Sequence, residues 1–62
     1  MFIKFDADFN STQEILDYIK LNKISLIKFI EIGPAGGNPN FTIFIDNFNQ
    51  HLQFIKFYYD IK

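Results

Sequence analysis

The chain has 62 residues, of which 48% are hydrophobic and 19% aromatic, and a formal net charge of −1. This composition excludes a disordered chain and predicts one small folded domain over residues 1–62. The chain has no cysteine and a single histidine, which excludes disulfides and zinc sites built from Cys or His. Self-association is then the remaining way in which so short a chain can bury its apolar surface.

The first half of the chain predicts a strand followed by a helix. Residues 2–9 alternate, with one face formed by Ile3, Phe5, Ala7 and Phe9. The run Ser11 to Glu14 is typical of a capping box, and predicts a helix over 12–22 that ends at Asn22 in a left-handed conformation. The apolar stripe of this helix is predicted to be Ile15, Leu16 and Ile19, with Tyr18 at its edge.

The second half predicts two strands and a helix. Residues 24–32 are apolar on both faces, which is typical of a central strand buried on both sides. Residues 33–40 hold all three glycines and both prolines, and predict an antiparallel connection to a strand over 41–46. A helix over 48–60 is expected to be capped by Asn47 with Gln50 as its partner, Asp46 being the competing cap. Its core-facing stripe is predicted to be Phe48, Leu52, Ile55 and Tyr59.

The predicted fold is therefore α+β, in the order β-α-β-β-α, with a three-stranded sheet and both helices on one face. This arrangement leaves apolar side chains over, on the last helix and on the open face of the sheet. An apolar patch on a small protein indicates a contact surface, and homodimers are the commonest assembly. The alternative is a fold that curls over its own aromatic residues. The predicted partner contacts are Phe54, Phe57, Tyr58, Ile61, Phe44, Phe29 and Phe2.

The glycine-rich loop is a candidate ligand site. Backbone amides at Gly33, Gly36, Gly37 and Asn38 could hold an anion such as a phosphate. The spacing of the glycines matches neither a P-loop nor a dinucleotide fingerprint. A purely structural hairpin connection is the alternative interpretation.

The remaining polar residues do not form a catalytic set. His51 has no nucleophile paired with it by any recognisable pattern. Asp6 and Asp8 share a strand face and could touch a hard cation, but solvated charges that protect a strand edge explain them equally well. We therefore expect a protein that is not an enzyme and that needs neither a cofactor nor a metal.

The charge distribution and hydropathy limit the partners. No arginine occurs, and the six lysines are spread singly along the chain, so a nucleic-acid-binding face is not expected. No stretch approaches the ~20 apolar residues that cross a bilayer, and the start of the chain lacks a signal-peptide pattern. The expected location is the cytoplasm, without a membrane partner.

The run from Glu31 to Pro39, followed by an alternating strand and a capped helix, resembles small α/β proteins of bacteriophages. The resemblance covers residues 31–50 and includes the phage inhibitors of the Hachiman defence system. It implies a phage protein in the host cytoplasm that binds a bacterial defence protein, or sequesters its signal, as a homodimer. No functional residues are carried over from it.

Together these features favour a non-enzymatic phage protein that antagonises an anti-phage defence system by protein–protein contact, as a homodimer. The first alternative is a sponge that encloses a nucleotide-like signal in the loop 33–40. The second is a structural subunit of the virion.

Overall fold

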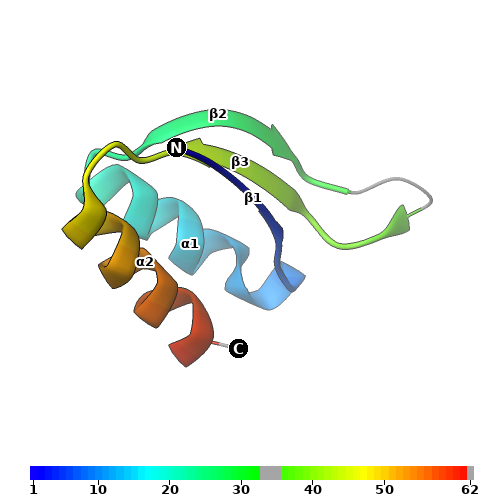
Figure 1. Cartoon of the computed structure of the whole chain (residues 1–62). Helices are drawn as coiled ribbons and strands as arrows, with labels where there is room; N and C mark the ends of the chain where they lie inside the picture. Colours follow the sequence, from blue (N-terminus) through cyan, green and yellow to red (C-terminus); the bar gives the residue numbers. More distant parts are fainter. Residues whose placement is uncertain (33–35, 62) are drawn as a thin grey trace.

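The computed structural model describes residues 1–32 and 36–61, which form β1 (Phe2–Asp6), α1 (Phe9–Leu21), β2 (Ser25–Ile30), β3 (Asn40–Phe44) and α2 (Phe48–Asp60). The strands make one antiparallel sheet in the order β1-β3-β2. Both helices lie against the same face of this sheet (Figure 1). The predicted α+β fold, with its order β-α-β-β-α and two helices on one face, is confirmed.

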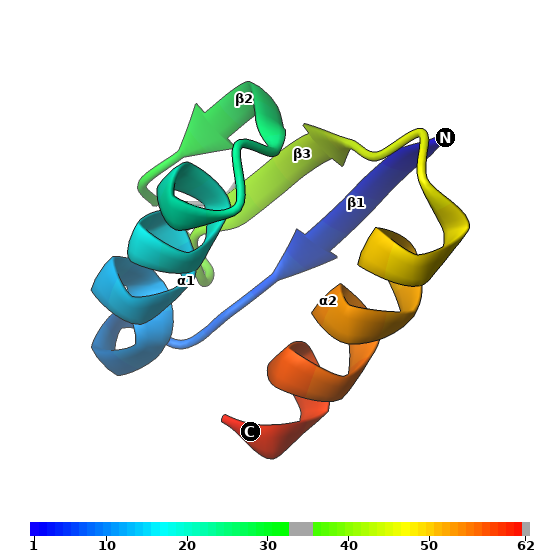
Figure 2. The ribbon, with the colours of Figure 1, turned by 90° about the vertical axis from the view of Figure 1, so that its left-hand side faces the viewer.

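The central strand is β3, not β2, so the prediction of a central strand over 24–32 is wrong. β3 pairs with β1 on one side and with β2 on the other, and its inward residues Phe41 and Ile43 are 1% and 0% exposed. β2 lies at an edge, and its first four residues are exposed. β1 and β2 therefore run parallel to each other with β3 between them, and α1 makes the connection beneath the sheet (Figure 2).

An irregularity in β2 changes which of its residues face the core. Leu26 pairs with Ile43 and Lys28 with Thr42, so Ile27 is an extra residue in the ladder. Such a bulge breaks the period-two alternation on which the prediction relied. As a result Phe29 lies opposite Phe41 on the helix-covered face, with 5.0 Å between the ring centroids.

The first helix begins three residues before its predicted start. Asp8 is its N-cap residue without a side-chain cap, and Ser11, the predicted cap, lies inside the first turn with its N–H bonded to the Asp8 carbonyl. The stripe was predicted correctly, since Ile15 and Ile19 are buried. The helix ends at Leu21, and the left-handed residue is Lys23 (φ 56°) rather than Asn22.

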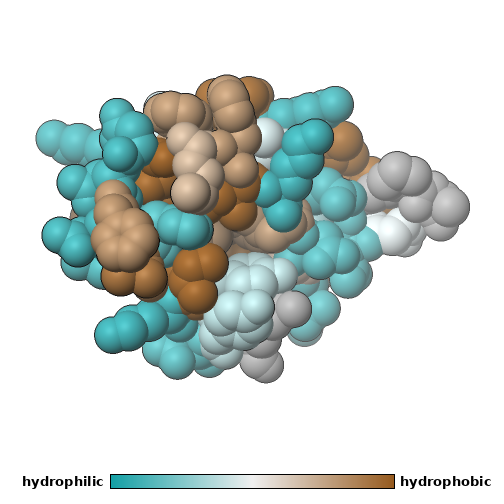
Figure 3. Space-filling model, viewed as in Figure 1, coloured by the Kyte–Doolittle hydropathy of each residue, from teal (hydrophilic) through white to brown (hydrophobic). Residues whose placement is uncertain are grey.

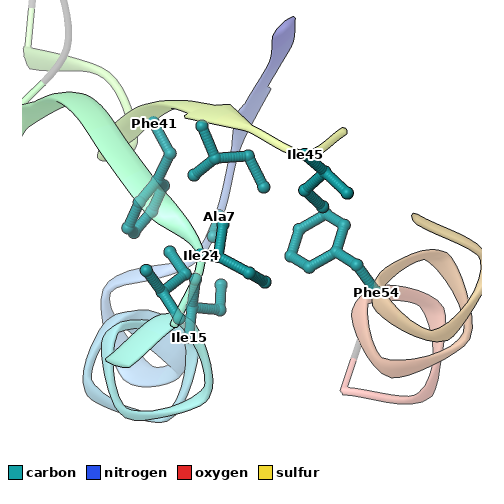
Figure 4. Close-up of a cluster of buried hydrophobic side chains, with 8 residues drawn as sticks. Ala7, Ile15, Ile24, Phe41, Ile45 and Phe54 are labelled. Atoms are coloured by element: carbon teal, nitrogen blue, oxygen red, sulfur yellow. The ribbon is translucent and has the colours of Figure 1, made fainter. Parts of the chain in front are cut away.

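The core lies between the sheet and the two helices, and all its buried side chains in the described residues are apolar. Figure 4 shows Phe54 pointing from α2 toward Ile45 and Ala7, with Ile15 on the facing side. Phe54 is 1% exposed, and its ring contacts those of Phe5, Tyr18, Phe57 and Tyr58. The eight core residues are Ala7, Ile15, Ile19, Ile24, Phe41, Ile43, Ile45 and Phe54.

Candidate protein-interaction surface

The second helix carries two apolar stripes, and the structure buries the one that was predicted to be exposed. The bounds of α2, Phe48–Asp60, were predicted correctly. Its predicted cap is also confirmed, because the Asn47 side chain accepts a 3.0 Å hydrogen bond from the Gln50 N–H. Phe54 lies in the core, and the other three members of its group pack half-buried against it. The prediction that these four residues are left over for a partner is therefore corrected: they are Phe54, Phe57, Tyr58 and Ile61.

The stripe that was predicted to face the core lies on the outside. Phe48 is 72% exposed, Leu52 46% and Tyr59 67%, and Ile55 is half-buried without packing on the core. Sequence reasoning found these four residues as a regular helical face but placed it on the wrong side. Successive members are 4, 3 and 4 residues apart, which is the alternation of a and d positions in a coiled-coil seam. We call these four residues the outer stripe of α2.

Contacts on either side of Phe54 explain why this side of α2 faces the core. The Phe57 ring stacks on Tyr18 of α1 with 4.0 Å between centroids and an interplanar angle of 13°. On the other side, the Tyr58 ring lies 5.2 Å from Phe5 of β1, and its hydroxyl donates a 2.7 Å hydrogen bond to the Asp6 carbonyl oxygen. The Phe54 side thus presents three rings that reach both α1 and β1, whereas the outer stripe offers a single row.

These contacts also place the outer stripe in the fold. At about 100° per residue, the order around α2 runs from Phe57 at α1, through Phe54 in the core and Tyr58 at β1, to the outer stripe. The stripe therefore lies on the flank of α2 that faces away from α1, beside β1. In Figure 2, α2 lies next to β1, on the side of the molecule away from β2 and α1.

The outer edge of β1 is open in the described part of the chain, because β1 pairs with β3 alone. Met1 and Ile45 exchange backbone hydrogen bonds in both directions, and the Ala7 N–H donates to the Pro39 carbonyl. Antiparallel pairs alternate, so the odd-numbered residues bond to β3 and the even-numbered ones turn their N–H and C=O outward. The outward set is Phe2, Lys4 and Asp6.

The sheet face opposite the helices is mixed rather than apolar. Phe2 is 65% exposed and meets the half-buried Phe44 edge to face, with 5.0 Å between centroids. Next to this pair, Lys4, Thr42 and Lys28 form a polar row across the strands. Figure 3 shows the same mixture above the helices, where brown side chains alternate with teal ones. Of the predicted contacts here, Phe2 and Phe44 lie on this face, and Phe29 lies on the other one.

The described residues of the predicted ligand loop do not form a binding site. Gly33 lies outside them. Gly36 has φ 79°, a left-handed conformation suited to glycine, and a Cβ added there would meet nothing within 4 Å. Gly37 and Asn38 are exposed, and the Asn38 carbonyl accepts from the Asn40 side-chain amide. Among the described residues of the loop, Pro39 is buried, and its carbonyl accepts a hydrogen bond from the Ala7 N–H.

Polar groups elsewhere are dispersed. Asp6, Asp8, Ser11 and Asn38 border a small hollow where the loop meets α1 and α2. Within residues 1–32 and 36–61, no three His, Asp or Glu side chains come together as metal ligands would. His51 is half-buried beside the amino-terminal end of β1. Burial raises the pKa of Tyr18, which belongs to the aromatic packing between the helices.

Neither of the two described helices is long and apolar enough to cross a membrane. Comparisons of the chain with protein-family models, with curated proteins and with solved structures found no match.

Proposed function

We propose that this protein is a non-enzymatic binding module that acts by protein–protein contact as a homodimer, with the outer stripe of α2 at its contact surface. The observation that carries the proposal is a helix with a second apolar stripe outside the core. The side chains of Phe48 and Tyr59 in this stripe are 72% and 67% exposed. Large aromatic side chains of this kind are enriched at protein interfaces.

The pattern of the stripe supports a helix as its partner. Exposed apolar residues occur singly on most proteins, but here three of them and the half-buried Ile55 line one face over three turns at coiled-coil spacing. A second copy of α2 offers the same row, and a two-fold axis brings two identical rows together. The neighbouring polar residues Asn49 and Lys56 then form the rim of the contact.

Sedimentation equilibrium of matched variants tests the proposal. Leu52→Asp places a charge in the outer stripe, and we expect it to weaken the dimer by at least about a hundredfold, because an unpaired carboxylate would be desolvated there. Gln53→Asp, on the exposed polar flank of the same helix, is the control and should leave the dimer intact. Equal masses for wild type and Leu52→Asp at every concentration would contradict the role of the stripe.

The narrower part of the proposal concerns the target. We propose that the dimer binds a component of a bacterial anti-phage defence system in the host cytoplasm, which rests on the resemblance of residues 31–50 to small phage proteins. The exposed Phe2 and its neighbour Phe44 are the proposed contacts, because they remain uncovered on the sheet face opposite the helices.

Co-expression with individual cloned defence systems tests this part. The expected result is restored plaque formation with wild type against one system, and loss of that effect with Phe2→Asp. Lys28→Asp, at the β2 end of the polar row on the same sheet face, is the matched control. Equal activity of Phe2→Asp and wild type would remove Phe2 from the target contact, and unchanged protection by every system would contradict the anti-defence role.

A further inference from the structure

The outer edge of β1 is a regular strand edge beside the outer stripe. Its outward-facing backbone groups belong to Phe2, Lys4 and Asp6, as the hydrogen bonds at Met1 and Ala7 show. The other edge of the sheet is different, because the extra residue Ile27 interrupts the β2 ladder. Bulges disfavour further pairing at an edge, and a regular edge favours it. Of the two edges, β1 is thus the better template for another strand.

We propose that β1 of a second copy pairs antiparallel with β1 across a two-fold axis at Phe5, so that two sheets join into one. This inference rests on the proposed homodimer and specifies its geometry. In this register Lys4 of each copy lies opposite Asp6 of the other. Two such pairs exchange their backbone hydrogen bonds, and both side chains are exposed on the sheet face away from the helices.

The charges select this register among the symmetric ones. An axis at Lys4 would place two ammonium groups directly opposite each other, which destabilises a strand pair. An axis at Ile3 would place Lys4 opposite Phe2 and leave Asp6 outside the pairing. Only the axis at Phe5 pairs each cation with an anion. The Asp6 carbonyl can also accept the new bond, because Tyr58 occupies one of its two lone pairs.

The same axis brings the outer stripes together. The Tyr58 ring packs on Phe5, and the ring of Tyr59 lies 5.6 Å from that of Tyr58. An axis through Phe5 therefore passes beside the carboxyl-terminal half of α2, and the two outer stripes approach each other beneath the joined sheets. The strand edge and the helix stripe become parts of one contact.

Charge reversal tests the register. We expect Lys4→Asp and Asp6→Lys each to weaken the dimer about tenfold, because each creates two like-charged pairs across the axis. The double variant, which swaps the two charges, should restore the dimer to within about twofold of wild type on the same account. A double variant as weak as the single variants would overturn the register, as would single variants that dimerise like wild type.

Cysteine cross-linking provides a second readout, since the chain has no cysteine of its own. In Lys4→Cys/Asp6→Cys, the paired Cα atoms would lie about 5.5 Å apart, within disulfide range, so oxidation should give a covalent dimer. Thr42→Cys is the control, because Thr42 pairs with Lys4 on the same face but would lie about 16 Å from its copy, three strand spacings across and two residues along the sheet.

The outcomes separate this inference from the function proposed above. A wild-type dimer that fails to cross-link at positions 4 and 6, or that cross-links equally through Thr42→Cys, overturns the β1 pairing and leaves the helix-stripe dimer standing. A wild-type chain that is folded and monomeric overturns both.

Discussion

The hydroxyl of Tyr58, near the end of α2, donates a 2.7 Å hydrogen bond to the backbone carbonyl oxygen of Asp6, at the end of β1. This bond joins two elements that are 52 residues apart in the chain, and it fixes the side of α2 that faces the sheet. We expect Tyr58→Phe to lower the free energy of unfolding by about 1 kcal/mol, the net value of one such bond. The ring contact with Phe5 would remain. Urea denaturation measures the change, and an unchanged free energy of unfolding in Tyr58→Phe would show that the hydroxyl is irrelevant.

Phe54 and Phe48 make a matched pair on the same helix. Phe54 is 1% exposed and Phe48 is 72% exposed. We expect Phe54→Ala to cost about 3–5 kcal/mol through the cavity that it leaves, which is most of the stability of a domain this small. Phe48→Ala should leave the fold intact and weaken self-association instead. Circular dichroism and urea denaturation at one fixed protein concentration distinguish them, and similar losses for both would contradict the assignment of the two stripes.

Lys23 adopts a left-handed conformation, with φ 56°, directly after the end of α1. A residue with a Cβ is strained there, and glycine is not. We expect Lys23→Gly to stabilise the protein by about 0.5–1 kcal/mol, with Lys20→Gly, inside the helix, as the destabilising control. A lower midpoint of thermal unfolding for Lys23→Gly would contradict this expectation.

Tyr18 provides a test by pH. Burial raises the pKa of its hydroxyl above the ordinary value of 10.0, so the folded state holds the proton more tightly than the unfolded state. The resulting contribution to the free energy of unfolding is present in full below pH 10, and it is lost as the pH rises through the folded-state pKa. We expect stability to fall above pH 10, and to fall less steeply in Tyr18→Phe. Denaturation midpoints between pH 8 and 11 measure this, and identical slopes would refute it.

The sequence was sufficient to predict the type and order of the elements, because their signals are local. The cap formed by Asn47 and Gln50, and the stripe containing Ile15 and Ile19, depend on residues within a few positions of each other. The order of the strands was not predictable in this way. β2 is apolar on both faces, as a central strand would be, but a bulge at Ile27 and an edge position account for the same pattern.

The candidate site shows the same limit. Two apolar stripes on α2 fit the helical period equally well, and only contacts distant in sequence decide between them. Phe57 stacks on Tyr18, and Tyr58 reaches β1, so the Phe54 side is buried. The presence of two stripes was visible in the sequence, as was the excess of aromatic residues. Which stripe remains for a partner depended on tertiary packing.

The central claim is that this chain associates with itself through α2 and the adjoining edge of β1. Size-exclusion chromatography with light scattering tests it most directly, at tens of micromolar wild-type protein whose fold is verified by circular dichroism. The account predicts a single closed species of twice the 7.4 kDa chain mass. A folded species of 7.4 kDa would contradict it, as would a ladder of ever larger oligomers.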